Sequence, residues 1–330
     1  MVPAIVPRKL RKGDGVRVIA PAHTLAMPFI NSQVRDIAAA RMKSLGLKVS
    51  YGKYVNESDV FQSSTVEHRI EDFNDALKDP SVQLLHAVIG GFNSNQMLRD
   101  LDYTLFRKAR KALCGFSDIT ALLNALYART GVVTYLGPLF FSFGEKLNFE
   151  YADEQFRHCL IDSGPFAIRP SPRWSNDRWA GKQDERTFSP TEYWAIHPGK
   201  AEGSIVGGNL CTFNLLQGTE YFPDLDGTIV LAEDDDTVPP WTFDRDLQSL
   251  IHQPGFKDVV GLAIGRFQPG SEMTLEKLTR IIETKPELKG LPVLANMDFG
   301  HTTPTATYPI GGTGRLFSET SDPRLEITRH

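Results

Sequence analysis

Three side chains in this 330-residue chain have the types and sequence settings of a hydrolytic centre, and the first is Ser117. It lies in Cys114-Gly115-Phe116-Ser117-Asp118-Ile119-Thr120, between an apolar run and a run of apolar residues at helical spacing. This pattern predicts a strand, a tight turn and a helix, with the hydroxyl at the turn and the first helical amides facing the atom it attacks. Ser-Asp is also an ordinary helix start with serine as the N-cap, so the motif alone leaves both interpretations open.

A serine nucleophile needs a base, and the base needs an acid that orients it. His301 is the candidate base because it lies in the turn Phe299-Gly300-His301-Thr302-Thr303-Pro304, after a predicted strand. Glu233 is the candidate acid because it follows the apolar run 228–231. The acidic run 233–236 also fits a solvated loop or a divalent metal site. No second acidic or histidine cluster stands at a matching strand end, so we expect no metal.

Gly90 and Gly91 follow another predicted strand, at residues 84–89. Glycines at such a turn let the backbone approach a ligand closely, which suits a phosphate cradle or an oxyanion hole. The GxGxxG spacing is absent. We therefore favour an oxyanion hole formed by the backbone amides of Gly91 and Asp118.

The elements that must position these residues alternate between strand and helix. In the first half, strands are predicted over 16–20, 47–51, 84–89 and 112–116, and helices over 34–45, 66–77 and 119–127. The 66–77 helix begins at the capping box Ser64-Thr65-Val66-Glu67. Strands are predicted again over 205–206, 228–231, 259–264 and 292–295, with helices up to 216 and over 244–252 and 275–284. Such alternation indicates a mostly parallel sheet covered on both faces, with the site at the carboxyl ends of the strands.

The periodicity is lost over 149–203, where Pro, Ser, Trp and charged residues mix. We expect a domain boundary and a long loop there. The segment holds Trp174, Trp179 and Trp194, three of the four tryptophans of the chain. They either pin the loop to the body or form a stacking surface for a ligand.

Composition excludes several classes of protein. Hydrophobic content of 41% and charged content of 23% are those of a globular protein, and 330 residues suggest two domains. A net charge of −4 without a basic stripe argues against nucleic acid binding. The cysteines Cys114, Cys159 and Cys211 have no metal-ligand spacing, which suits a reducing compartment. No run approaches the ~18 apolar residues of a membrane helix and no signal peptide is evident, so we expect a cytoplasmic protein.

Taken together, seven motifs resemble those of the LD-carboxypeptidase and microcin C self-immunity peptidase family. They occur in the same order between residues 13 and 312. The motifs are Gly90-Gly91-Phe92-Asn93-Ser94-Asn95, Gly115-Phe116-Ser117-Asp118-Ile119-Thr120, Gly137-Pro138, Gly207-Gly208-Asn209-Leu210, Leu231-Ala232-Glu233-Asp234, Gly300-His301-Thr302-Thr303-Pro304 and Pro309-Ile310-Gly311.

The resemblance implies a serine peptidase with the triad Ser117, Glu233 and His301, which needs no cofactor and forms a homodimer. It also implies an α/β fold with two domains, an N-terminal Rossmann-like parallel sheet domain that carries the serine and a C-terminal α/β domain that carries acid and base. We place them at residues 1–165 and 203–330, with 166–202 as an interdomain segment and substrate loop.

Two branches of the family differ in substrate. The immunity branch cleaves a peptidyl or aminoacyl nucleotide and has a tryptophan-bearing loop, which Arg173-Trp174-Ser175-Asn176-Asp177 and Trp179 resemble. The murein branch removes D-alanine from a tetrapeptide. We favour the first, with a small peptide or peptidyl-nucleotide substrate. The expected substrate contacts are Gly90, Asn93, Asn209, Trp174 and Trp179. A non-catalytic binding protein on the same fold is the remaining alternative, and it would leave the triad atoms too far apart to hydrogen-bond.

Overall fold

The first half of the chain forms the mostly parallel sheet that its alternating pattern predicts. The structure is a computed structural model that describes residues 4–330. A six-stranded sheet has the order β14-β5-β4-β3-β1-β2, in which only β14 runs antiparallel to its neighbour. The elements of this half are β1 (Gly15–Ile19), α1 (Ser32–Ser44), β2 (Lys48–Tyr51), α2 (Val66–Lys78), β3 (Val82–Ala87), α3 (Tyr103–Ala109), β4 (Ala112–Gly115), α4 (Thr120–Thr130), β5 (Thr134–Leu136) and α5 (Glu150–Leu160), with the 3₁₀ helices η1 (Ser94–Met97), η2 (Ser117–Ile119) and η3 (Phe141–Gly144).

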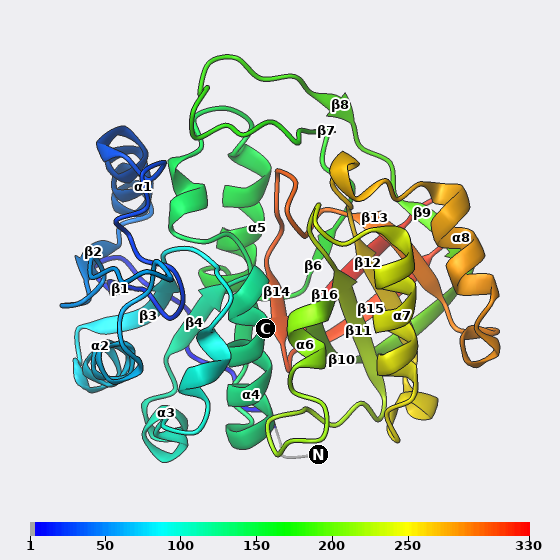
Figure 1. Cartoon of the computed structure of the whole chain (residues 1–330), viewed down its shortest axis with the longest axis horizontal. Helices are drawn as coiled ribbons and strands as arrows, with labels where there is room; N and C mark the ends of the chain where they lie inside the picture. Colours follow the sequence, from blue (N-terminus) through cyan, green and yellow to red (C-terminus); the bar gives the residue numbers. More distant parts are fainter. Residues whose placement is uncertain (1–3) are drawn as a thin grey trace.

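The second half forms an eight-stranded sheet beside the first (Figure 1), in the order β6-β16-β15-β10-β11-β12-β13-β9. The strands β10 to β13 are parallel, and antiparallel strands flank them on both sides. The elements of this half are β6 (Phe166–Ile168), β7 (Arg173–Trp174), β8 (Ser189–Pro190), β9 (Trp194–His197), β10 (Gly199–Asn209), α6 (Leu210–Asn214), β11 (Thr228–Glu233), α7 (Pro240–Ile251), β12 (Gly261–Gly265), α8 (Leu275–Glu283), β13 (Val293–Met297), β14 (Tyr308–Ile310), β15 (Thr313–Ser318) and β16 (Arg324–Arg329), with η4 (Phe256–Asp258), η5 (Pro269–Ser271) and η6 (Pro286–Leu288).

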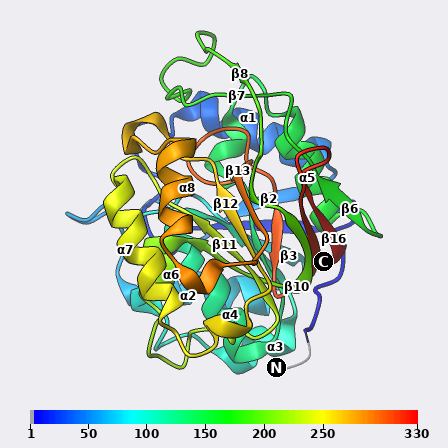
Figure 2. The same ribbon diagram turned by 90° about the vertical axis from the view of Figure 1, so that its right-hand side faces the viewer.

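The expected α/β fold with two sheet-based units is therefore confirmed. Several predicted helices and strands agree with the structure to within a few residues. The Thr65 side chain accepts a hydrogen bond from the His68 amide and caps α2, as the capping box predicts. Helices α7 and α8 cover one face of the second sheet (Figure 2). The division at 1–165, 166–202 and 203–330 stays a prediction. No helix within residues 4–330 is long and apolar enough to cross a membrane.

The expectation of a long loop over the whole of 149–203 is wrong at both ends. Residues 150–160 form α5, which buries Phe156 and Leu160, and β10 begins at Gly199. The first part of β10 pairs antiparallel with β15 and alternates half-buried with exposed residues, so it lacks the continuous apolar run of a central strand. Between α5 and β10 in the chain, β7 and β8 form a two-stranded ribbon that projects above the body (Figure 1).

The two halves meet where α4 packs on the carboxyl end of β10. Asn124 of α4 donates to the Gly207 carbonyl at 3.0 Å and accepts from the Gly207 amide at 2.9 Å. The Asn209 amide donates to Thr120 Oγ1 at 3.0 Å. All these groups are buried, and one apolar cluster runs through both sheets around them. Because α4 begins three residues after Ser117, this contact fixes the predicted nucleophile against the second sheet.

Strand β14 also joins the halves. Residues 308–310 come late in the chain, but they pair with β5 at the edge of the first sheet. The next strand, β15, returns to the second sheet beside β10. Residues 308–318 thus tie the segment after His301 to both sheets.

Replacement of Gly207 by alanine tests the contact between β10 and its neighbours. Gly207 has a φ of +103°, and an added Cβ would lie 2.1 Å from the Leu231 carbonyl oxygen. We expect Gly207→Ala to cost roughly 2–5 kcal/mol of unfolding free energy through strain and overpacking. Thermal unfolding measures this as a clear fall in Tm.

Gly218 is the matched control. Its φ is +74°, but no atom lies within 4 Å of an added Cβ. Gly218→Ala should therefore lose only about 1–2 kcal/mol for its left-handed backbone. Equal losses for the two variants would contradict a steric role for Gly207.

Candidate active site

The turn after β4 presents Ser117 in a strained conformation. Ser117 has a φ of +62°, which is rare for a residue with a side chain and concentrates at functional sites. Its hydroxyl contacts His301 rather than a helix amide, and Phe116 occupies the N-cap position of η2. An added Cβ at Gly90 would lie 3.0 Å from Ser117 Cβ and 3.1 Å from its Oγ. The glycine turn after β3 thus leaves room for the serine.

Ser117, His301 and Glu233 form a continuous hydrogen-bonded chain. Each comes from the carboxyl end of a different strand: Ser117 after β4, Glu233 as the last residue of β11, and His301 in the loop after β13. Nε2 of His301 lies 2.9 Å from Ser117 Oγ, and Nδ1 lies 2.9 Å from Glu233 Oε2. The Glu233 side chain is 2% exposed and that of His301 is 19% exposed. The acid is therefore enclosed, whereas the imidazole reaches a cavity.

Close backbone packing holds the acid against the imidazole. Gly300 has a φ of +106°, and a Cβ there would lie 2.9 Å from Glu233 Oε2. A Cβ at Gly265 would lie 2.7 Å from Glu233 Cβ. Only glycine leaves space for the carboxylate at both positions.

The buried acid shifts the pKa of the histidine. Burial alone would lower the pKa of His301, but the charge and hydrogen bond of Glu233 raise it to about 9. The next carboxyl, Asp234, is also buried and accepts from Asn209 Nδ2 at 3.1 Å. Burial, followed by the charge of Glu233, raises the pKa of Asp234 to about 7. The acidic run is thus partly enclosed and not a wholly solvated loop.

Two backbone amides beside the serine are candidates for the predicted oxyanion hole. Within residues 4–330, the amides of Gly91 and Asp118 donate to no protein acceptor. The Asp118 carboxylate accepts from the Ser94 amide at 2.9 Å, and Ser94 Oγ donates to the Asp118 carbonyl at 2.7 Å. These bonds fix the turn at residues 90–94 against the turn that carries the serine. The pair suits a developing oxyanion.

Comparison with known proteins places the chain in a family. The LD-carboxypeptidase N-terminal domain matches residues 16–137, and the LD-carboxypeptidase C-terminal domain matches residues 202–316. The chain belongs to the LD-carboxypeptidase family. The resemblance drawn from the seven motifs is thereby confirmed.

Individual relatives of this LD-carboxypeptidase match over nearly their whole length. The putative carboxypeptidase YocD of Bacillus subtilis is 46% identical to this chain. The match covers 98% of this chain and 99% of YocD. The crystal structure of an MccF-like protein from Bacillus anthracis is 43% identical with a TM-score of 0.97, and covers 99% of this chain and 100% of its own. The microcin C7 self-immunity protein MccF of Escherichia coli is 31% identical over 92% of this chain and 90% of its own.

Two kinds of relative have similar identity to this chain, since MccF is 31% identical and a murein peptide carboxypeptidase is 30% identical. A structure of MccF in complex with glutamyl sulfamoyl guanosine has a TM-score of 0.87 at 27% identity, covering 98% of each chain. A probable murein peptide carboxypeptidase of Bacillus subtilis is 30% identical over 92% of this chain and 89% of its own. Overall identity therefore does not separate the two branches of the family.

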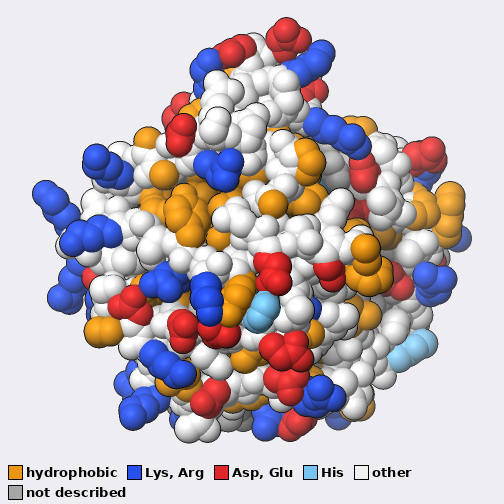
Figure 3. Space-filling model, turned by 60° about the vertical axis from the view of Figure 1, so that its left-hand side comes forward, with side chains coloured by type: hydrophobic (Ala, Val, Ile, Leu, Met, Phe, Trp, Pro, Cys, Tyr) orange, Lys and Arg blue, Asp and Glu red, His pale blue; other side chains and the backbone are white. Residues whose placement is uncertain are grey.

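A cavity of about 340 Å³ opens on the serine and the histidine, and a second of about 540 Å³ adjoins it. Gly90, Gly91, Ser117 and His301 line the first. The same three aromatic side chains, Phe29, Phe141 and Trp179, border both cavities. The Trp179 ring stacks on the Phe141 ring with 4.6 Å between their centroids, and the Phe29 ring meets the Phe141 ring edge-on with 5.4 Å between centroids. Figure 3 shows hydrophobic side chains gathered beneath the projecting lobe. This aromatic wall suits a flat ligand group.

The structure brings only some of the expected substrate residues to these cavities. Trp179 and Gly90 line them, but Trp174, Asn93 and Asn209 do not. The Trp174 ring lies over the Arg266 guanidinium at 5.2 Å, which is an anchoring contact. Asn93 bonds to Ser63, and Asn209 caps α6.

Sequence reasoning missed several residues that line the first cavity, among them His23, Phe141 and Glu145. His23 follows β1 at a strand end, a signal that could have identified it. Phe141 and Glu145 lie in a short 3₁₀ segment and its cap, which no periodicity marks. Within the described part of the chain, no group of three or more His, Cys, Asp or Glu is placed to hold a metal ion.

The coupling of His301 to Glu233 can be measured directly by NMR. We expect the imidazole of His301 to titrate near 9 in the wild-type protein. Glu233→Gln removes the negative charge that raises the pKa of His301, while the burial that lowers this pKa remains. The pKa of His301 should therefore fall to or below the ordinary histidine value of about 6.5. His301→Gln assigns the resonance. A pKa that does not change in Glu233→Gln would contradict the coupling.

Proposed function

We propose that this protein is a serine carboxypeptidase whose triad is Ser117, His301 and Glu233. The observation that supports it is the unbroken pair of 2.9 Å contacts from Glu233 through His301 to a serine in a strained strand-to-helix turn. The alternative of a non-catalytic binding protein predicts triad atoms too far apart to hydrogen-bond, and these distances argue against it.

The geometry supports one order of steps. Ser117 Oγ attacks the carbonyl carbon of an amide while His301 Nε2 takes its proton. The Gly91 and Asp118 amides stabilise the oxyanion. The imidazolium then gives the proton to the leaving amine, and Glu233 stabilises its charge from the Nδ1 side. Water, activated by the same imidazole, hydrolyses the acyl-enzyme.

For the substrate, we propose a peptidyl or aminoacyl nucleotide of the microcin C type. Solved structures of MccF hold glutamyl sulfamoyl guanosine and aspartyl sulfamoyl adenosine, and this chain has their fold. In this chain, the wall of Phe29, Phe141 and Trp179 beside the triad offers a nucleobase an apolar surface. A murein tetrapeptide with a terminal D-alanine is the competing substrate. The homodimer and the cytoplasmic location stay predictions.

Ser117→Ala tests the nucleophile. The variant should fold with a normal Tm and lose hydrolysis of aspartyl sulfamoyl adenosine by at least about 10³-fold, because triad members act as a unit. Release of the amino acid measures the rate. Activity within about tenfold of the wild type would exclude Ser117 as the nucleophile.

Trp179→Ala tests the substrate class. If a nucleobase packs on the aromatic wall, kcat/KM for aspartyl sulfamoyl adenosine should fall about 5- to 150-fold, or about 1–3 kcal/mol. Cleavage of an L,D-tetrapeptide should change far less because D-alanine has no ring. Trp174→Ala is the control, since this tryptophan lines neither cavity. Equal losses on both substrates would remove the support for the nucleotide and favour the murein substrate.

A further inference from the structure

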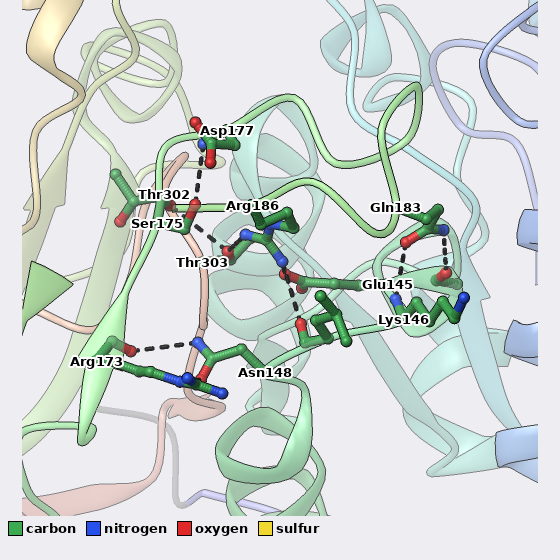
Figure 4. A network of polar contacts seen from close by, with 12 residues as sticks. Glu145, Lys146, Asn148, Arg173, Ser175, Asp177, Gln183, Arg186, Thr302 and Thr303 are labelled. Carbon is green, nitrogen blue, oxygen red and sulfur yellow. Dashed lines mark hydrogen bonds and ion pairs between the residues drawn. The ribbon is translucent and has the colours of Figure 1, made fainter. Parts of the chain in front are cut away.

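A buried ion pair joins the loop over the active site to the first half of the chain. We call residues 175–187 the roof segment, because residues 175–181 line the second cavity. Arg186 of this segment contacts Glu145, and their side chains are 0% and 2% exposed (Figure 4). Glu145 lines the first cavity, which contains Ser117. No step of the proposed mechanism uses this pair.

The Arg186 guanidinium bonds to both sides of the site at once. Nη1 contacts the Glu145 carboxylate and donates to the Leu147 carbonyl at 3.1 Å. Nη2 donates to Thr303 Oγ1 at 2.6 Å. Thr303 lies two residues after His301. A planar guanidinium fork with fixed donor directions can hold these three partners in one geometry, which a lysine cannot do.

Further bonds make the roof segment a bridge between the halves. Thr303 and Ser175 exchange backbone hydrogen bonds of 2.8 and 3.0 Å. Gln183 donates to the Gly144 carbonyl at 2.8 Å and accepts from the Lys146 amide at 2.9 Å (Figure 4). Trp179 stacks on Phe141 between these anchors. The histidine loop and the aromatic wall are thus held by the same short segment.

We propose that Arg186 and Glu145 are positioning residues, which hold the His301 loop in register with Ser117 and the roof segment over the cavities. The proposal rests on the proposed function for its effect on turnover. A buried ion pair adds little net stability, because desolvation offsets the attraction between the charges. What this pair supplies is a fixed geometry, because the planar guanidinium of Arg186 holds its partners at set directions.

The test uses a double variant, Glu145→Gln with Arg186→Met, in the full chain. A single Arg186→Met leaves a buried carboxylate without its partner, which is strongly destabilising in itself. The double variant removes both charges and the fork while keeping similar volume. Its Tm should stay near that of the wild type. Asp184→Asn is the control, because the Lys146–Asp184 pair lies in the same network but is solvent-exposed.

Turnover should separate positioning from mere stability. In the double variant, kcat for aspartyl sulfamoyl adenosine should fall about 10- to 100-fold, because a small displacement of the base from the serine slows proton transfer. Arg186→Lys keeps the charge without the fork and should lose kcat by a similar factor. Asp184→Asn should leave kcat and KM unchanged. A folded double variant with wild-type kcat would overturn the proposal.

Two readouts need no substrate. Trypsin should cut after the exposed residues Arg178 and Lys182 at least about tenfold faster in the double variant, because an unanchored loop opens more often. The NMR pKa of His301 should fall by about one unit as its contact with Glu233 loosens. Wild-type values for both would refute the positioning role. If the wild-type protein cleaves neither substrate, the proposed function fails, while these two readouts still decide the role of the pair.

Discussion

The contact between α4 and the end of β10 sets the geometry of the candidate active site. Ser117 belongs to one sheet, and Glu233 and His301 belong to the other. The hydroxyl of Thr120, one helical turn after the serine, accepts a hydrogen bond from the Asn209 amide. Asn209 in turn lies opposite Glu233 in the pairing of β10 with β11. The distance from Ser117 to Glu233 is therefore fixed by two steps, the hydrogen bond from the Asn209 amide to the Thr120 hydroxyl and the pairing of β10 with β11. An added Cβ at Gly208 would lie 2.6 Å from Thr120 Oγ1, so glycine is what permits this approach.

Burial then gives the residues their chemical character. Glu233 is enclosed and has a protein partner only at one oxygen, since its Oε1 finds none among the described residues. A carboxylate in that setting interacts strongly with the one cation beside it, and the raised pKa of His301 expresses this. The neutral imidazole that can take the serine proton is therefore more populated as the pH rises toward 9. The strained backbone at Ser117 and the glycine turn at 90–91 complete the arrangement from the other sheet.

Local sequence signals predicted the parts of the site that lie at strand ends. Ser117, Glu233 and His301 each follow an apolar run, and Thr65 begins α2 as its capping box indicates. The features that the sequence did not predict depend on contacts between residues that are distant in sequence. Arg186 and Glu145 are an ordinary pair of charges until the fold buries them together, 41 residues apart. Trp174 reads as a ligand surface, but Arg266 occupies its ring. The partly exposed strand residues over 194–204 lack the apolar run that would have revealed them.

The late return of β14 to the first sheet affects how the molecule is made. Until residues 308–310 have left the ribosome, β5 has an unpaired edge, and the His301 loop has no second attachment. A nascent chain that already carries Ser117 thus lacks its base and the strand that closes the sheet around it. The contact between Ser117 and His301 can form only after residue 301 has been made, so a shorter nascent chain carries the serine without its hydrogen-bonded partner.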